Sequence, residues 1–198
     1  MRSFDPNRRP GRVHAHREAT AIAALTLAFA TDPANRWCWP GPAEYLAAFP
    51  SFVRALGGNA FTTECAFDIA GGAGIALWLP PGAEPDEAEL ISIIQRTVHA
   101  SRQNDLFELI RQMGQYHPQS PHWYLPFVGV EPLQQGRGLG ALLLQPILQR
   151  CDDERLPAYL ESTNPRNIPF YERLGFERAG MMQAGSSPAI VPMLREPQ

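Results

Sequence analysis

The feature that most constrains this chain is an apolar run that leads directly into a glycine-rich turn and then into an apolar helical pattern. Residues 122–130 (HWYLPFVGV) are predicted to form a strand, and residues 139–151 a helix. Between them, Gly136, Gly138 and Gly140 allow a sharp turn and a close approach to the backbone. A helix start presents unpaired N–H groups and a partial positive charge, which suit a diphosphate. The unit therefore predicts an α/β fold with an anion site at this turn.

The rest of the chain alternates helical and strand patterns, which predicts a mixed, strongly twisted sheet flanked by helices, a fold of the α/β class. Helices are predicted over residues 18–30, 42–56 with an interruption at Pro50, 84–115 with a break near Asn104, and 168–174. Strands are predicted over residues 60–69, 74–79, 157–163, 176–183 and 189–194. We interpret residues 1–198 as a single domain, in which residues 1–12 form a flexible tail.

Composition argues against several classes of function. The net charge of −3 provides no basic face for a run of phosphates, so nucleic acid is not expected as a partner. No stretch approaches the ~20 apolar residues of a membrane span, and the first residues hold no apolar signal core, so we expect a cytoplasmic protein without a membrane partner. Three cysteines and five scattered histidines suggest reduced thiols and no metal site.

Glycine-rich turns occur in two kinds of nucleotide-binding motif, the P-loop and the dinucleotide-binding turn. The Gly-Lys-Ser/Thr of a P-loop is not present, but the loose dinucleotide pattern G-x-G-x-x-A fits Gly136, Gly138 and Ala141, with Glu161 about twenty residues further on. This unit lies late in the chain, and only one strand–helix pair and a closing strand pair follow it. That is too little for a doubly wound nucleotide domain, which leaves the dinucleotide reading as the weaker alternative.

The same turn resembles the acetyl-CoA signature of the GNAT superfamily of N-acetyltransferases, Gln/Arg-x-x-Gly-x-Gly/Ala, in Gln135, Gly138 and Gly140. About twenty residues downstream, residues 160–176 (LESTNPRNIPFYERLGF) resemble the family's second block, Asn…(Phe/Leu)-Tyr-Glu-x-x-Gly-Phe. Both blocks occur in the family's order. Within the superfamily, the second block and residues 29–36 are most similar to the puromycin N-acetyltransferase-like members.

The resemblance implies the GNAT acyl-CoA N-acyltransferase fold and acetyl-CoA as co-substrate. In that fold two adjacent parallel strands, here the ones ending near Val130 and Thr163, diverge and admit the pantetheine arm. The cofactor-binding residues implied are the backbone of the first strand, the turn that holds the pyrophosphate, and two asparagines: Phe127, Val128, Gly129, Val130, Gln135, Gly136, Arg137, Gly138, Leu139, Gly140, Ala141, Asn164 and Asn167. Asn167 is also placed to cap the helix that follows it.

For catalysis, the resemblance places Tyr171 at the family's general-acid position, where its phenol would protonate the departing thiolate. Glu161 is the best candidate base, directly or through water, and a structural or substrate-anchoring carboxylate is its alternative role. His122 opens the cofactor strand, where a histidine is more often structural than catalytic. Cys151 lies on the apolar helix and is a poor nucleophile, so we expect direct attack by the amine in a ternary complex.

The expected acceptor is a primary amine on a small molecule, held in a pocket that Trp37, Trp39, Tyr45 and Trp78 could line. Two alternatives stay open: a non-catalytic module that binds or senses acyl-CoA, and an enzyme that acetylates a protein N-terminus or lysine. The sequence fixes neither the acceptor nor the oligomeric state, which leaves a homodimer open.

Overall fold

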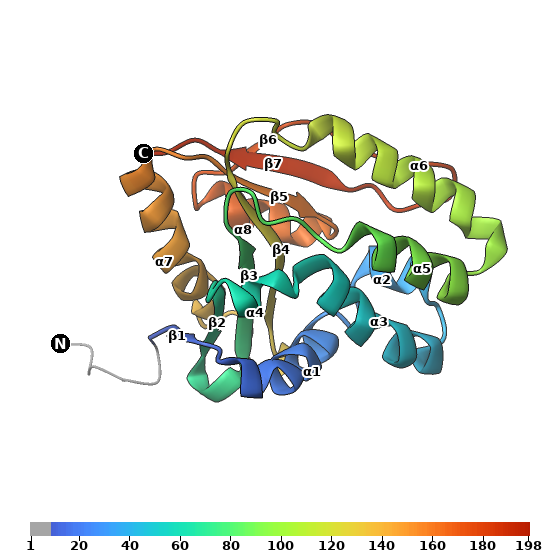
Figure 1. Ribbon diagram of the computed structural model, residues 1–198, viewed down its shortest axis with the longest axis horizontal. Coiled ribbons are helices and arrows are strands. Elements are labelled where there is room, and N and C mark those ends of the chain that lie inside the picture. Colours follow the sequence, from blue (N-terminus) through green and yellow to red (C-terminus); the bar gives the residue numbers. More distant parts are fainter. Residues whose placement is uncertain (1–8) are drawn as a thin grey trace.

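The computed structural model describes residues 9–198, and these residues form one seven-stranded mixed sheet (Figure 1). The strand order is β1-β2-β3-β4-β5-β7-β6, and within the described part of the chain only the β4–β5 pair is parallel. The strands are β1 (Gly11–Arg12), β2 (Ala66–Ile69), β3 (Gly74–Leu79), β4 (Trp123–Val130), β5 (Ala158–Ser162), β6 (Glu177–Arg178) and β7 (Val191–Arg195). The predicted mixed α/β sheet is confirmed.

Helices cover both faces of the sheet, and α1 and α7 lie on opposite sides of β3 and β4 (Figure 1). The helices are α1 (Glu18–Ala28), α2 (Pro33–Cys38), α3 (Pro42–Gly57), α4 (Asn59–Thr62), α5 (Glu87–Thr97), α6 (Ala100–Tyr116), α7 (Leu139–Glu154) and α8 (Ile168–Glu172). Short 3-10 turns precede α1, α7 and α8 at Ala15–Arg17, Pro132–Gln134 and Pro165–Asn167.

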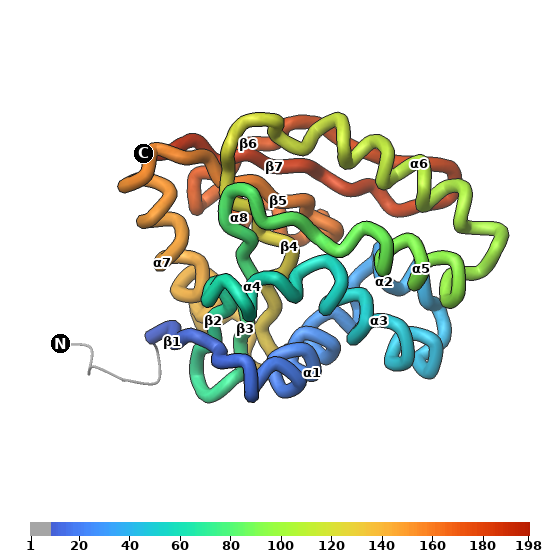
Figure 2. The backbone as a smooth tube through the Cα atoms, viewed as in Figure 1, coloured from blue at the N-terminus to red at the C-terminus, as the bar shows by residue number. Residues whose placement is uncertain are grey.

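Two apolar cores result, because side chains alternate between the faces of each strand. In β3, Ile75 and Leu77 pack with α1, α3 and α5, whereas Ala76 and Trp78 pack with α7. A third, smaller cluster joins α6 to the segment between β6 and β7, where Leu109 packs against Met182, Ala184 and Ile190. Figure 2 shows α6 running alongside that returning segment.

Strands β4 and β5 pair only at their starts and then separate. Among the described residues, the parallel register holds Trp123 against Ala158 and Tyr124 against Tyr159, after which β4 follows β3 and β5 follows β7. The β3–β4 register shifts between Leu77 and Leu79, so β4 carries an extra residue at this point. Such a bulge bends a strand, and Pro126, which lies within it, has no N–H to donate. The predicted divergence of the two parallel strands is confirmed.

The first part of the chain differs from the sequence prediction at several boundaries. Gly11 and Arg12 pair with β2, so the tail predicted for residues 1–12 ends before them; its first eight residues lie outside the described part of the chain. Strand β2 starts only at Ala66, because residues 59–62 form α4. Pro50 lies inside an unbroken α3, whose buried face includes Phe49 and Val53. Packing of that face outweighs the hydrogen bond that proline removes.

One helix start was also predicted wrongly, and one helix was missed. The break near Asn104 lies instead at Val98 and His99, because Val98 is extended and the His99 ring accepts a hydrogen bond from the Ser101 N–H at the start of α6. Helix α2 was not predicted: Asp32 is its N-cap and Pro33 its first residue, after α1 has ended at Ala28.

Candidate active site

The glycine-rich turn connects the end of β4 to the start of α7. The Gln135 side chain donates a hydrogen bond of 3.0 Å to the Val130 carbonyl and fixes the turn to the strand end. Gly136 and Gly138 have φ of 73° and 81°, a conformation that favours glycine. Helix α7 starts at Leu139 with Gly138 as N-cap, and within the described part of the chain no side chain caps it and its first turn holds no acidic residue. The first N–H groups of a sixteen-residue helix are therefore available to an anion.

Helix α8 packs against this helix start and carries Tyr171. A Cβ on Gly140 would lie 3.3 Å from the Phe170 ring, so the small residue permits close contact between the two helices. Tyr171 is buried among Phe170 and Phe176, with ring centroids 5.0 and 6.0 Å away. Burial and the negative charge of Asp32 raise the pKa of the Tyr171 phenol above its usual value of 10.0. The phenol thus holds its proton at neutral pH.

Asn164, and not Asn167 as predicted, makes the capping hydrogen bond in the second block. Asn164 accepts a hydrogen bond of 3.1 Å from the Arg166 N–H and so caps the 3-10 turn before α8. Asn167 precedes α8, yet its side chain makes no capping bond within residues 9–198. The cap therefore belongs to Asn164, and its amide nitrogen is not used by that bond.

Glu161 lies on β5, on the same face as Tyr159, which packs in the core formed with α1, α3 and α5. Its side chain is only 5% exposed, and its Oε1 lies 3.9 Å from Nδ1 of His117, the residue that ends α6. The Tyr124 and Tyr159 phenols have their pKa raised by burial and by the negative charge of Glu161. His122 completes the group, with Nε2 at 2.9 Å from Nε2 of His117. The sequence indicated a structural His122, and it did not single out His117.

Asp32 is the functional candidate that sequence reasoning missed. It is 6% exposed and caps α2 through Oδ1, which accepts from the N–H groups of Ala34 (3.0 Å) and Asn35 (3.1 Å). Its Oδ2 accepts a bond of 2.6 Å from the hydroxyl of Thr163, which lies just beyond β5. Desolvation raises the pKa of the Asp32 carboxyl. The Asp-Pro pair was a readable cap signal, but the contact with Thr163 spans 131 positions and has no local signature.

The aromatic wall predicted for the acceptor pocket is wrong in part. Trp78 lies in the core on the α7 face, away from the face that carries Tyr45 and Trp39. Trp39 is 2% exposed and packs edge-on against Phe52 of α3. Tyr45 is equally buried and donates to the Thr26 carbonyl at 2.8 Å. Of the four aromatics, Trp37 alone is partly exposed, and its ring nitrogen donates to Ser186 at 3.2 Å.

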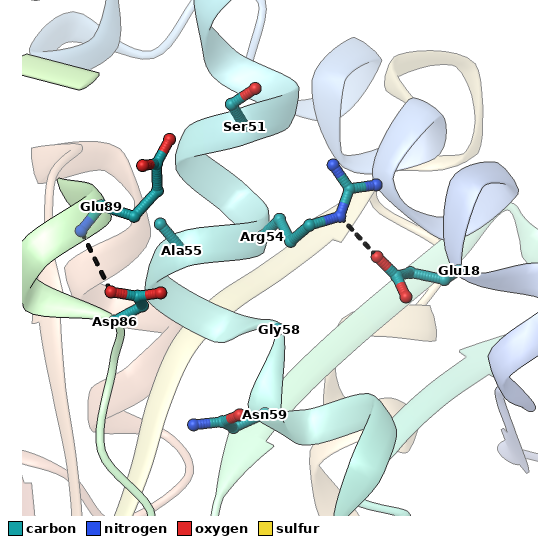
Figure 3. A pocket seen from close by; sticks show the side chains of 8 residues that line it. All are labelled: Glu18, Ser51, Arg54, Ala55, Gly58, Asn59, Asp86 and Glu89. Atoms are coloured by element: carbon teal, nitrogen blue, oxygen red, sulfur yellow. Dashed lines mark hydrogen bonds and ion pairs between the residues drawn. The ribbon is translucent and has the colours of Figure 1, made fainter. Parts of the chain in front are cut away.

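A surface hollow of about 510 Å³ lies between α1, the end of α3 and the start of α5 (Figure 3). Its charged side chains already have partners: Arg54 pairs with Glu18 at 2.7 Å, Asp86 accepts from the Glu89 N–H at 3.0 Å, and Glu89 pairs with Arg96 at 3.0 Å. None of the residues predicted for the site lines it. Across residues 9–198, no group of three or more His, Cys, Asp or Glu side chains is arranged to hold a metal ion. No helix of that same range is long and apolar enough to cross a bilayer.

Comparison with known proteins identifies one family. The Acetyltransferase (GNAT) family matches residues 36–176. An uncharacterised N-acetyltransferase of Schizosaccharomyces pombe is 42% identical over 79 residues, which cover 38% of this chain and 32% of that protein, so the match spans about a third of the relative's own length.

Solved structures are similar over nearly the whole chain. A histone acetyltransferase HPA2 and related acetyltransferase from Corynebacterium glutamicum is 25% identical, with a TM-score of 0.66 over 96% of each chain. The arylalkylamine N-acetyltransferase 2 of Aedes aegypti has the same TM-score at 13% identity, over 96% of this chain and 99% of the other.

Proposed function

Because this chain belongs to the GNAT family of acetyltransferases, we propose that it transfers the acetyl group of acetyl-CoA to a primary amine of a small molecule, by direct attack in a ternary complex. The observation that carries the proposal is the separation of β4 from β5 beside the uncapped start of α7. On this proposal, the unpaired edge of β4 and the start of α7 would bind the co-substrate, and Tyr171 and Glu161 would transfer the protons.

Two parts of the protein would hold the co-substrate, which supplies an activated acetyl thioester. Phe127 to Val130 pair with β3 on one edge, and their other edge, on the side of β5, is not paired with it, so its amide groups could bind a linear amide chain as an added strand does. The N–H groups from Gly138 to Ala141 would bind the pyrophosphate, with the exposed Arg137 beside them. Asn164 and Asn167 would lie along the arm as it leaves the cleft.

Tyr171 and Glu161 would divide the proton transfers. The Tyr171 hydroxyl stays protonated because of its raised pKa, so it can donate to the departing thiolate as general acid. The Glu161 carboxylate is nearly buried on β5, the strand that separates from β4, and would take a proton from the acceptor nitrogen. Such groups typically contribute about 10²–10⁴-fold each to the rate.

The thiols support direct transfer over an acetyl-enzyme. Burial raises the pKa of Cys151 to about 12, and that of Cys38 to about 12 as well. Cys65 is buried too, with its pKa also raised. A thiol in these surroundings is a weak nucleophile at neutral pH.

The charge near the site favours a cationic acceptor. Glu161 and Thr163 point to the same face of β5 because they are two residues apart, and Thr163 holds the carboxylate of Asp32 there. Two acidic side chains therefore flank the face opposite α7, where an ammonium group would be attracted. Helix α6 and the segment around Met182 cover this side, which suits a small acceptor better than a protein chain.

The first test is calorimetric titration with acetyl-CoA, followed by thiol release over a panel of amines. Tyr171→Phe is expected to keep acetyl-CoA affinity and to lose about 100-fold or more in kcat, because only the proton donor is removed. Thr62→Val, which removes an exposed hydroxyl on α4 that within residues 9–198 bonds only to the Asn59 carbonyl, is the control and should keep wild-type turnover. Tight binding without turnover on any amine would favour a sensing module, acetylation of peptides alone would favour a protein acceptor, and failure to bind acetyl-CoA would contradict the proposal.

A further inference from the structure

Three polar side chains are in successive contact: Glu161 of β5, His117 at the end of α6, and His122 just before β4. Glu161 is 5% exposed, His117 is 30% exposed, and their closest atoms, Oε1 and Nδ1, are 3.9 Å apart. His117 and His122 contact each other through their Nε2 atoms at 2.9 Å, with ring centroids 4.7 Å apart and the planes at 70°. These contacts thus connect a buried carboxylate to a partly solvated imidazole.

The hydrogen bonds of His122 determine where its proton lies. Its Nδ1 is 2.8 Å from the Ser120 carbonyl, which can only accept, so Nδ1 carries the hydrogen. Burial lowers the pKa of His122, which favours the neutral ring. A neutral ring with its hydrogen on Nδ1 has a bare Nε2. That atom must accept, and the Nε2 of His117 must donate to it.

The same reasoning leaves one nitrogen of His117 unassigned. With its hydrogen on Nε2, the neutral ring has a bare Nδ1, and this atom faces Glu161. A bare nitrogen and a carboxylate are both acceptors, so the pair is able to share one added proton. At 3.9 Å the transfer requires a small side-chain shift or one bridging water.

Other ionisable groups around the pair come from three elements and one loop. The charged neighbours of His122 include Glu84, in the segment before α5, as well as Glu161. The phenol groups are Tyr124 of β4, Tyr159 of β5 and Tyr116 at the end of α6. Burial keeps the Tyr124 and Tyr159 phenols protonated, so they do not compete for the added proton.

We propose that Glu161 and His117 form a proton relay that carries a proton from the acceptor ammonium to solvent, with His122 as the positioning residue that fixes the tautomer of His117. The relay rests on the proposed acetyl transfer, and it adds the route by which the proton of the acceptor leaves the site. The ammonium N–H bond breaks as the Glu161 O–H bond forms; that O–H bond then breaks as the proton bonds to Nδ1 of His117, and the Nδ1–H bond breaks as the proton passes to water, which restores the Glu161 carboxylate and the neutral His117. No electrons are transferred between the groups, and the acceptor nitrogen is left with its lone pair.

The relay predicts a specific dependence on pH. Wild-type enzyme can bind the ammonium form and deprotonate it, so its kcat/KM levels off while the acceptor is still mostly protonated in solution. His117→Gln keeps a polar side chain that cannot carry a proton, so only the neutral amine reacts. Its kcat/KM should rise about tenfold per pH unit up to the ionisation of the amine, and added imidazole should restore part of the loss.

The experiment compares wild type, His117→Gln and His122→Gln on the most active amine of the panel, with His16→Gln, at an exposed histidine before α1, as the matched control. Thermal melting checks folding, and ¹⁵N NMR of the wild-type apoprotein reads the tautomers independently of activity. The expected tautomers are Nδ1–H for His122 and Nε2–H for His117.

A pH profile of His117→Gln parallel to that of wild type, a loss that neither pH nor imidazole restores, or an Nε2–H tautomer of His122 would each overturn the relay. Absence of thiol release by wild type on every amine is a different result: it overturns the acetyl transfer itself, whatever the tautomers are.

Discussion

At the scale of single residues, Asp32 shows how one carboxylate can join distant segments. One of its oxygens caps α2 and the other holds Thr163 beyond β5. Its charge also reaches the Tyr171 phenol, whose pKa it helps to raise. Asp32 therefore connects α2 to the end of β5, and after burial it is the second contribution that raises the pKa of Tyr171.

Replacing Asp32 should change how stability depends on pH. The folded-state pKa of Asp32 is raised, so the folded chain binds the proton more tightly than the unfolded chain, and the wild-type free energy of unfolding decreases as pH rises through that pKa. Asp32→Asn preserves the cap but has no such titration. Urea unfolding between neutral pH and about pH 4 should show wild type gaining stability relative to Asp32→Asn as pH falls.

The control is Asp32→Ala, which removes the cap and leaves Thr163 without its acceptor. It should cost about 2–4 kcal/mol of unfolding free energy at neutral pH, from the lost cap and the unpaired hydroxyl together. A constant difference between wild type and Asp32→Asn at every pH would contradict the assigned pKa direction.

At the scale of elements, the contact between α1 and β4 depends on a residue without a side chain. A Cβ on Gly129 would lie 2.7 Å from Cβ of Ala28 and 3.1 Å from the Leu25 side chain. Helix α1 thus lies directly on the strand that would bind the pantetheine arm, and its distance from the sheet fixes the position of that strand.

Gly129→Ala should lower the free energy of unfolding by about 1–3 kcal/mol, because the added methyl group overpacks this contact, and it should weaken acetyl-CoA binding. Gly114→Ala is the matched control: Gly114 lies within α6, and no described atom outside its own helix turn lies within 4 Å of the added Cβ. That change should stabilise the protein by about 0.5–1 kcal/mol. Denaturant unfolding and calorimetry measure both effects, and equal shifts for the two variants would contradict the close approach.

Elements with strong local signals were predictable, and those set by distant contacts were not. The turn from β4 into α7 has glycines, an apolar strand and an apolar helix in sequence, so its prediction needed no tertiary information. Strand β2 was predicted too early because Ala60 and Phe61 suit either a helix or a strand, and only their burial in the α1–α3 core decides between them. The same holds for the site: Tyr171 and Glu161 lie within a motif, whereas His117 and Asp32 reach it only through the fold.

At the scale of the whole molecule, the sheet consists of two parts that meet at the first residues of β4 and β5. One part is β1 to β4 and the other is β5, β7 and β6; among the described residues two register pairs join them. A ligand that binds between the parts contacts both and therefore favours the folded state over the unfolded chain.

Acetyl-CoA should accordingly raise the melting temperature. At 100 times the dissociation constant the expected gain is about 2.7 kcal/mol of unfolding free energy. Tyr171→Phe should show the same gain, because the role proposed for the phenol is proton transfer and not ground-state binding. A thermal shift assay with acetyl-CoA, and with adenosine alone as the control for the nucleotide end, measures it. A shift produced fully by adenosine would contradict binding across the two parts.

The bulge at Pro126 also bears on aggregation. A strand edge with open amide and carbonyl groups recruits extended polypeptides, and long exposed edges are a common origin of aggregates. Here the open edge of β4 is short, since it starts after Pro126 and ends at Val130, where the Gln135 amide already occupies the carbonyl. A foreign strand would gain few hydrogen bonds along it, whereas a short linear amide such as the proposed pantetheine arm would need no more. The length of this edge, limited by Pro126 and Gln135, would then favour the proposed cofactor over an extended peptide.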